Sequence, residues 1–272
     1  MIMIDNYPDI TKKCFINAPF DRLQNELLEL FTGNRIQPEI GLEGAWFWDC
    51  PFGNFEKIAR IFQEQGLDCT LHAPFHDLAP GGFDKRIVAL TREKLGRAFA
   101  LIDLFRPRAI VCHLGFEENK HQAQFDRWLE TSLSTWKPLV ELAASSGTKV
   151  HFENTYEQGS VAHKRLLQEL DAENVGFCLD TGHLMAFAGT GWRPWLKELG
   201  PWLGQLHLHD NDTTTDAHLA LGAGSFDFFD LFGYLKENNL RPLVTLEPHS
   251  RQDLLHSLAY IDKTGLFDLL PK

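Results

Sequence analysis

The sequence predicts a single (β/α)8 TIM barrel over residues 1–272. Strand-like and helix-like runs alternate from end to end, which is typical of βαβ units with parallel strands. There are eight such units, and a barrel of ~250 residues is an ordinary size for one domain. No Gly-x-Gly-x-x-Gly follows the first strand, so the alternative, a doubly wound dinucleotide-binding sheet, has no support. No Pro/Gly/Ser-rich linker or low-complexity block indicates a second domain.

Each predicted strand is a short apolar run that ends at a polar or turn-forming residue. We expect strands at 13–17, 36–42, 68–72, 109–113, 149–153, 175–179, 204–209 and 242–247. The helical runs between them lie near 21–31, 54–66, 84–105, 122–145, 161–170, 195–199 and 226–238, and a last helix begins near 251. Asn54 is the expected N-cap and Gly66 the expected C-cap of the second helix.

Composition narrows the function classes. The chain is 44% hydrophobic and 23% charged, which is normal for a globular protein with a sizeable core. Its formal net charge of −11 disfavours DNA as a partner, because nucleic-acid binders are usually basic. No signal peptide or apolar run of ~18 residues is present, so we expect no membrane association. The five scattered cysteines, three of them inside strand-like runs, fit buried free thiols and a cytoplasmic location.

The motif around which the candidate site is organised follows the sixth predicted strand. That strand ends in Asp180-Thr181-Gly182-His183, a carboxylate and an imidazole three residues apart. Strands three to eight all end in such a residue, and in a closed barrel these ends meet at one rim, where active sites of this fold lie. The residues at the six ends are His72, His113, Glu153, Asp180, His207 and Glu247.

Three loop residues, His183, Asp216 and His218, bring the candidate ligands to nine. Neutral imidazole with carboxylate selects Zn, Mn, Fe or Co, and we expect one to three ions per chain. Glu153 is the expected bridge between two ions. The three expected groups are His72 with His113 and Glu153, Asp180 with His207 and Glu247, and His183 with Asp216 and His218.

Plainer interpretations apply to each residue taken alone. A single histidine at a strand end is more often a hydrogen-bonded structural residue than a ligand. Asp216-Ala217-His218 by itself would be a solvated loop, His209 a supporting residue, and His151 a packed core histidine. Six consecutive strands with such ends favour the metal site. Lys120, Lys164 and Arg193 are candidates to reach a phosphate, although their spacing does not show it.

The chain resembles the xylose-isomerase-like barrel superfamily, which includes sugar and sugar-phosphate isomerases and epimerases and the endonuclease IV type of apurinic/apyrimidinic endonuclease (family 2). The resemblance is carried by Leu71-His72-Ala73-Pro74-Phe75, Val111-Cys112-His113-Leu114-Gly115, Phe152-Glu153-Asn154-Thr155, Leu179-Asp180-Thr181-Gly182-His183, His207-Leu208-His209-Asp210-Asn211, Asp216-Ala217-His218 and Leu246-Glu247.

In the endonuclease branch the resemblance implies that the nine residues hold three zinc-type ions. In the isomerase branch it implies a single Mn, Mg or Co held by Glu153, Asp180, His207 and Glu247. The endonucleases usually have Asp-Arg-His where this chain has Asp216-Ala217-His218, and here Phe75 stands after the first ligand in place of a tyrosine. These departures weaken the case for DNA recognition and leave metal binding intact.

Three functions remain open at this stage. The leading hypothesis is hydrolysis of a phosphoester in a small or nucleotide-like substrate, with Glu153 orienting a metal-bound hydroxide. The alternative is isomerisation or epimerisation of a sugar or sugar phosphate, with Glu153 and Glu247 as the acid–base pair. A metal-containing binding module without turnover ranks last. The expected partner is therefore a small phosphate or sugar, and the oligomeric state is left open.

Overall fold

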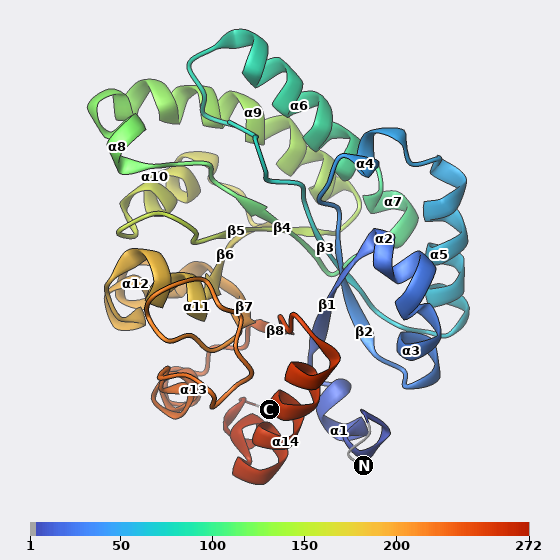
Figure 1. Cartoon of the computed structure of the whole chain (residues 1–272). Helices are drawn as coiled ribbons and strands as arrows, with labels where there is room; N and C mark the ends of the chain where they lie inside the picture. The colour runs from blue at the N-terminus through green and yellow to red at the C-terminus, as the bar shows by residue number, and fades with distance from the viewer. Residues whose placement is uncertain (1–3, 272) are drawn as a thin grey trace.

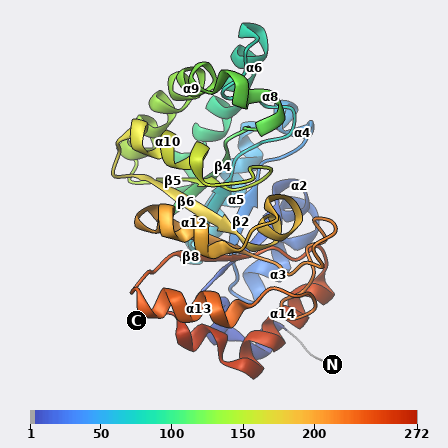
Figure 2. The same ribbon diagram turned by 90° about the vertical axis from the view of Figure 1, so that its left-hand side faces the viewer.

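The computed structural model of the protein describes residues 4–271. Strands β1 to β8 close into one barrel in chain order, and every neighbouring pair is parallel. Figure 1 shows the strands at the centre with the helices around them, and Figure 2 shows the same layers from the side. The predicted TIM barrel is confirmed. The strands are β1 (Phe15–Pro19), β2 (Gln37–Gly41), β3 (Thr70–His72), β4 (Ala109–His113), β5 (Lys149–Glu153), β6 (Val175–Asp180), β7 (Leu203–Leu208) and β8 (Leu243–Leu246).

Helices precede, connect and follow the strands, and the longer ones cover the outside of the barrel (Figure 1). They are α1 (Pro8–Thr11), α2 (Phe20–Arg22), α3 (Leu28–Gly33), α4 (Trp46–Asp49), α5 (Phe52–Glu64), α6 (Lys85–Phe99), α7 (Ile102–Phe105), α8 (Glu118–His121), α9 (Phe125–Ser145), α10 (Val161–Leu170), α11 (Thr181–His183), α12 (Trp192–Leu199), α13 (Phe228–Glu237) and α14 (Arg251–Thr264). Two π-helical turns, Leu23–Leu27 and Leu184–Ala188, extend α2 and α11.

Two helix predictions are wrong in detail. The helix expected at 84–105 is two helices, α6 and α7, and Asp84 is the N-cap whose side chain accepts from the amides of Arg86 and Ile87. Asn54 is not an N-cap, because α5 begins at Phe52 after the extended residue Pro51. The strand boundaries agree within two residues, since apolar runs and the turns after them are strong local signals.

The main hydrophobic core lies between the strands and the helices. Alternate strand residues point outward, as in Phe152, which packs edge-on against Trp136 of α9 at 5.1 Å between ring centroids. Phe177 stacks on Trp195 of α12 at 5.9 Å. The residues on the other side of each strand point into the lumen, where polar side chains gather. The fold thus separates an apolar layer, between the strands and the helices, from a polar barrel lumen.

The expected burial of the thiols is confirmed, because all five cysteines are buried and free. Among the helices within residues 4–271, none combines the length and the apolar character that a membrane crossing requires.

Candidate metal centre

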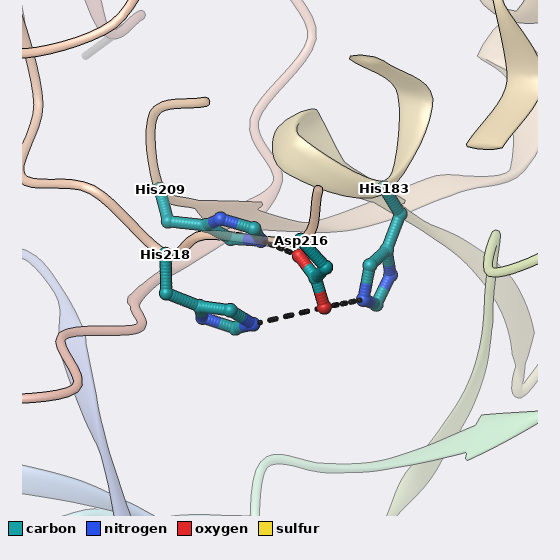
Figure 3. A group of neighbouring side chains, drawn as sticks. All are labelled: His183, His209, Asp216 and His218. Atoms are coloured by element: carbon teal, nitrogen blue, oxygen red, sulfur yellow. Dashed lines mark hydrogen bonds and ion pairs between the residues drawn. The ribbon is translucent and has the colours of Figure 1, made fainter. Parts of the chain in front are cut away.

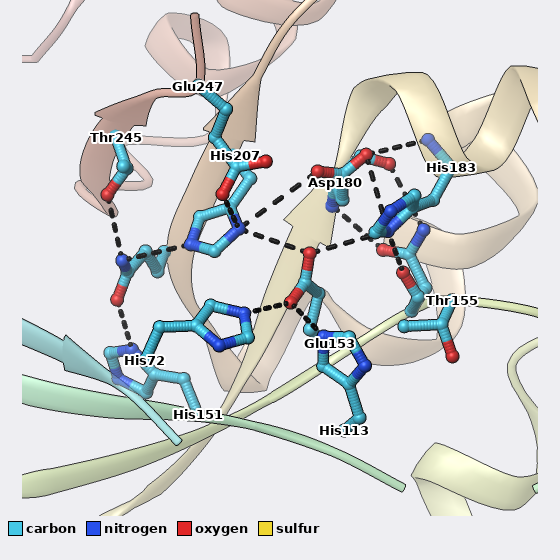
Figure 4. Close-up of polar contacts among 12 residues, drawn as sticks. His72, His113, His151, Glu153, Thr155, Asp180, His183, His207, Thr245 and Glu247 are labelled. Carbon is cyan, nitrogen blue, oxygen red and sulfur yellow. Dashed lines mark hydrogen bonds and ion pairs between the residues drawn. The ribbon is translucent and has the colours of Figure 1, made fainter. Parts of the chain in front are cut away.

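The barrel carries the predicted side chains to one rim. His72, His113, Glu153 and Asp180 are the last residues of β3, β4, β5 and β6. His207 is the penultimate residue of β7, and Glu247 directly follows β8. Figure 4 shows these side chains turned toward one another above the strands. The side-chain contacts described below connect all nine predicted ligands, while their binding of metal stays a prediction.

Glu153 is the centre of the group and is only 1% exposed. Its Oε2 lies 3.1 Å from His72 Nε2 and 3.0 Å from His113 Nε2. Its Oε1 lies 3.1 Å from His207 Nδ1 and 3.4 Å from His183 Nδ1. Each oxygen of one carboxylate therefore faces two imidazoles, which is the arrangement expected of a carboxylate that could bridge two cations.

Three of the imidazoles have one ring nitrogen held by a backbone carbonyl. His72 Nδ1 lies 3.0 Å from the oxygen of Ala73, His183 Nδ1 lies 2.9 Å from that of Asn154, and His218 Nδ1 lies 3.2 Å from that of Glu247. A carbonyl only accepts, so Nδ1 carries a proton in each of these rings, and Nε2 is the nitrogen left to bind a cation. Metal-binding histidines are oriented in this way. The donor set thus fits a divalent cation such as zinc or manganese.

A second group of side chains lies beside the first (Figure 3). Asp216 Oδ2 lies 3.4 Å from His183 Nε2 and 3.3 Å from His218 Nε2. His209 joins this group, because its Nε2 lies 3.8 Å from Asp216 Oδ1 and 3.1 Å from Asp180 Oδ1. Buried Asp216 Oδ1 has no hydrogen-bond partner in the described part of the chain, which leaves it free for a cation. His209, expected as support, is therefore itself a candidate ligand.

The loop that carries Asp216 and His218 is built on one carboxylate. Buried Asp210 accepts hydrogen bonds from the amides of Asn211 at 2.9 Å, Gly222 at 2.9 Å and Phe226 at 3.0 Å. The backbone of Asp210 also pairs with Leu219 across the loop. These bonds fix the loop in front of the barrel mouth. Asp216 and His218 are therefore held in place and do not lie in a freely solvated loop.

The glycine of the Asp180-Thr181-Gly182-His183 motif is required by packing. A Cβ atom on Gly182 would collide with the imidazole of His209. The Asp180 side chain accepts a hydrogen bond of 2.6 Å from the His183 amide, which starts the short helix α11. Backbone and ligand geometry are therefore set by the same four residues.

The charges in the group stabilise one another. Burial opposes ionisation of Glu153, but the imidazoles of His207 and His113 outweigh burial and hold its pKa well below the usual value. The pKa of His207 is well above its usual value, because nearby carboxylates outweigh the effect of burial. The pKa of His113 is lowered, because burial dominates there. In the absence of a cation, the rings whose pKa is raised, such as His207, supply the positive charge that these buried carboxylates need.

The group forms the floor of a cavity of about 330 Å³ at the barrel mouth. Within the described chain, no lysine or arginine lines it. Lys120, Lys164 and Arg193, named as candidates to reach a phosphate, pair with Glu117, Glu198 and Asp230, and none of the three lines the cavity. Spacing along the chain does not show on which side of the barrel a loop or helix residue points.

Several residues of the cavity were not predicted from sequence. Phe187 and Tyr156 form one wall, with ring centroids 4.8 Å apart, and Phe75 stacks on His113 at 4.2 Å. Phe75 differs from the other two, because its place after the third predicted strand makes it a candidate for a hydrophobic substrate wall. Buried Glu39 of β2 was missed altogether, although its Oε1 lies 3.0 Å from His207 Nε2. The one available signal was a charged residue at a strand position whose side chain alternates with outward-facing Ile40.

Comparisons with known proteins place this geometry in a family. A profile described as "Xylose isomerase-like TIM barrel" matches residues 28–264. Uncharacterized protein MJ1311 of Methanocaldococcus jannaschii is 25% identical over 215 residues, which cover 75% of this chain and 72% of that protein. Uncharacterized protein MJ1614 of the same organism is 25% identical over 237 residues, or 86% and 90% of the two chains.

Solved structures agree in fold. A D-tagatose 3-epimerase-like protein superposes with a TM-score of 0.79 at 22% identity, covering 94% of this chain and 98% of the other. A Thermus thermophilus protein soaked with zinc chloride gives 0.76 at 24% identity, with 94% and 97% covered. A D-psicose 3-epimerase in the presence of D-fructose gives 0.74 at 12% identity, with 92% and 98% covered. The family profile spans most of the sequence, and the chain belongs to the xylose isomerase-like TIM barrel family.

Proposed function

We propose that this protein is a divalent-metal-dependent isomerase or epimerase of an uncharged sugar. The observation that carries the proposal is the meeting of two buried carboxylates at one imidazole under the cavity. Glu153 Oε1 and Glu247 Oε1 lie 3.1 and 3.0 Å from the same His207 Nδ1. Two carboxylates at the floor of a small cavity are suited to move a proton from one carbon position of a substrate to another.

The two glutamates would have different roles. One carboxylate oxygen would take the proton from the carbon next to a carbonyl, and the other carboxyl would return a proton to the opposite face or to the neighbouring carbon. A bound divalent cation would polarise the carbonyl and hydroxyl oxygens of the sugar. Asp180 and His207 would complete the ligand set with the two glutamates. Neither step changes the oxidation state of the whole substrate.

The cavity favours a substrate without phosphate. Its lining carries Glu43 and Asp216 but, among described residues, no lysine or arginine that could neutralise a phosphate. Phe75 and Phe187 offer apolar faces beside the polar floor, a combination that is common in small-molecule sites. Among the similar structures, the names D-psicose 3-epimerase, L-ribulose 3-epimerase and 3-keto-D-glucoside 4-epimerase support the same substrate class.

Isotope exchange tests the proposal. The protein loaded with manganese, cobalt or zinc is incubated in heavy water with a panel of ketoses and aldoses, and the sugars are examined by NMR. We expect deuterium at the carbon next to the carbonyl. The Glu153→Gln and Glu247→Gln variants should abolish exchange, whereas Glu198→Gln, which removes an exposed partner of Lys164, should not. Deuterium exchange at the wild-type rate in both the Glu153→Gln and the Glu247→Gln variant would overturn the proposal.

Phosphoester hydrolysis is the second candidate, and the comparisons favour it less than the isomerase. It is favoured by the group of His183, His209, Asp216 and His218, which has no evident task in a one-metal isomerase. Elemental analysis separates the two functions. A stoichiometry near one ion per chain agrees with the isomerase. A stoichiometry near three, together with release of phenol from a phosphodiester probe and no deuterium exchange, would replace it with the hydrolase.

A further inference from the structure

A polar layer fills the barrel lumen directly below the candidate ligands. The interior of a TIM barrel is usually packed with branched apolar residues. Here the layer contains one carboxylate, one amide, one imidazole and two hydroxyl groups, all at most 4% exposed. Its members come from β2, β7, β5, β3 and β8, and they are Glu39, Gln205, His151, Thr70 and Thr245. A buried carboxylate is costly unless it is fully paired, so its partners indicate what it does.

The two oxygens of Glu39 have different surroundings. Oε2 accepts three hydrogen bonds, from Thr70 Oγ1 at 2.9 Å, Gln205 Nε2 at 2.6 Å and Thr245 Oγ1 at 3.1 Å. Oε1 lies 3.0 Å from His207 Nε2, an ion-pair contact without hydrogen-bond geometry, and the amide nitrogen of Gln205 lies 3.3 Å from the same ring nitrogen. Three donors from three strands therefore fix the carboxylate, and its remaining oxygen points at the imidazole of a candidate ligand.

The orientation of the amide is also fixed. Gln205 Oε1 lies 3.0 Å from His151 Nδ1, so the oxygen faces the imidazole and the amide nitrogen faces Glu39. Gly204 and Gly176 leave the space for the His151 ring, since a Cβ on either would come within 3.0 Å of it. The layer has one consistent hydrogen-bond direction, which runs from His151 through Gln205 to Glu39.

We infer that Glu39 is a positioning residue for His207. The negative charge of its Oε1, 3.0 Å from Nε2, favours a ring proton on Nε2 and leaves the lone pair of Nδ1 for a cation held by Glu153 and Glu247. Backbone carbonyls do this for His72, His183 and His218, whereas His207 depends on a side chain from a strand far away in the sequence. The inference rests on the metal-binding part of the proposed function and is independent of the reaction catalysed.

The effect of Glu39→Gln follows from the donors. The amide oxygen of the new side chain must face Thr70, Gln205 and Thr245, because all three donate. Its NH2 group then points at His207 Nε2 and donates to it, which drives the ring proton to Nδ1. The lone pair is thereby removed from the metal side. Changes in partners of this kind typically lower metal affinity about 10- to 100-fold.

The test combines nitrogen NMR of histidine-labelled protein with chelator competition for zinc. In the zinc-loaded wild type we expect His207 with its proton on Nε2 and zinc on Nδ1. Glu39→Gln should lower zinc affinity about 10- to 100-fold. Thr70→Val is the matched control, since it removes one bond to Oε2 and leaves Oε1 in place; its affinity should fall by a far smaller factor.

Each other outcome overturns the inference. Zinc on His207 Nε2 in the wild type would refute it without any variant, and so would an unchanged affinity in Glu39→Gln. Equal losses in Glu39→Gln and Thr70→Val would show that the whole layer matters and the carboxylate has no special part. If the wild type binds no zinc, both this inference and the metal-binding part of the proposed function fail. If the wild type shows deuterium exchange but binds zinc through Nε2 of His207, this inference fails and the proposed function still holds.

Discussion

Metal-free protein should lose stability as the pH rises from about 6.5 to about 9, because His218 holds a proton there only when folded. Burial opposes the charged ring, but Asp216 at 3.3 Å and Glu247 at 3.7 Å outweigh burial and raise the pKa of His218 to about 9 from an ordinary 6.5. Below pH 6.5 the folded and unfolded chains both bind the proton, and the stabilisation is complete. Above about pH 9 neither binds it, and the stabilisation is lost.

The magnitude follows from the two pKa values. At about 1.4 kcal/mol per pKa unit, the difference between 6.5 and about 9 corresponds to roughly 3 kcal/mol. Asp216 is 28% exposed, and screening by solvent reduces the effect to about 2 kcal/mol. The pKa of His72, His183 and His207 is also raised, so these rings add to the slope of the wild type. Only the difference between the wild type and a His218 variant isolates this ring.

Urea unfolding in the presence of a chelator, followed by tryptophan fluorescence, measures the effect. The free energy of unfolding is compared at about pH 6 and about pH 9.5 for the wild type, His218→Gln and His256→Gln. The wild type and His256→Gln, which alters an exposed ring on α14, should lose about 2 kcal/mol more than His218→Gln. A His218→Gln protein with the full wild-type slope would refute the reasoning.

Three further predictions follow from the site. Glu247→Gln should lower the affinity for zinc or manganese, measured by calorimetry, more than about 10-fold, because even residues that only contact a metal ligand typically contribute that much. Glu198→Gln should keep wild-type affinity. Gly182→Ala should cost about 1–3 kcal/mol in thermal unfolding, because its methyl group meets the His209 ring; Gly159→Ala, with open space around it, should be nearly neutral, and equal melting temperatures would contradict the packing. Adding zinc at about 100 times its Kd to chelator-treated protein should stabilise it by about 2.7 kcal/mol, and an unchanged melting temperature would argue against a metal site.

The sequence predicts the strand ends of this fold well because each rests on a local signal. An apolar run followed by His, Glu or Asp, as in 109–113 or 149–153, defines both the strand and the side chain at its end. Closure of the barrel then brings the ends together without further information. Asp180 and His183 are predictable for the same reason, because strand, turn and ligand are contiguous.

The unpredicted residues depend on long-range geometry. Glu39 lies in a short strand with Pro38, and nothing local shows that its neighbours are Gln205 and Thr245, more than 160 residues away. Tyr156 lies in a loop and Phe187 in the short π-helical turn after α11, and in neither place does a sequence periodicity fix the direction of the side chain. The break between α6 and α7 near Ala100 has no glycine or proline to mark it. In each case tertiary contacts determine the local structure or the direction of the side chain, and the sequence pattern gives no signal for it.

The polar lumen limits how this protein could be made more heat resistant. Every hydrogen bond around Glu39 has a fixed direction. Replacing one residue of this polar layer by a larger apolar one would therefore leave several buried donors without an acceptor. The outer helices tolerate change more readily, since Leu90 is 52% exposed and Val161 is 66% exposed. Engineering for industrial temperatures should therefore begin on the helical surface and leave the inside of the barrel untouched.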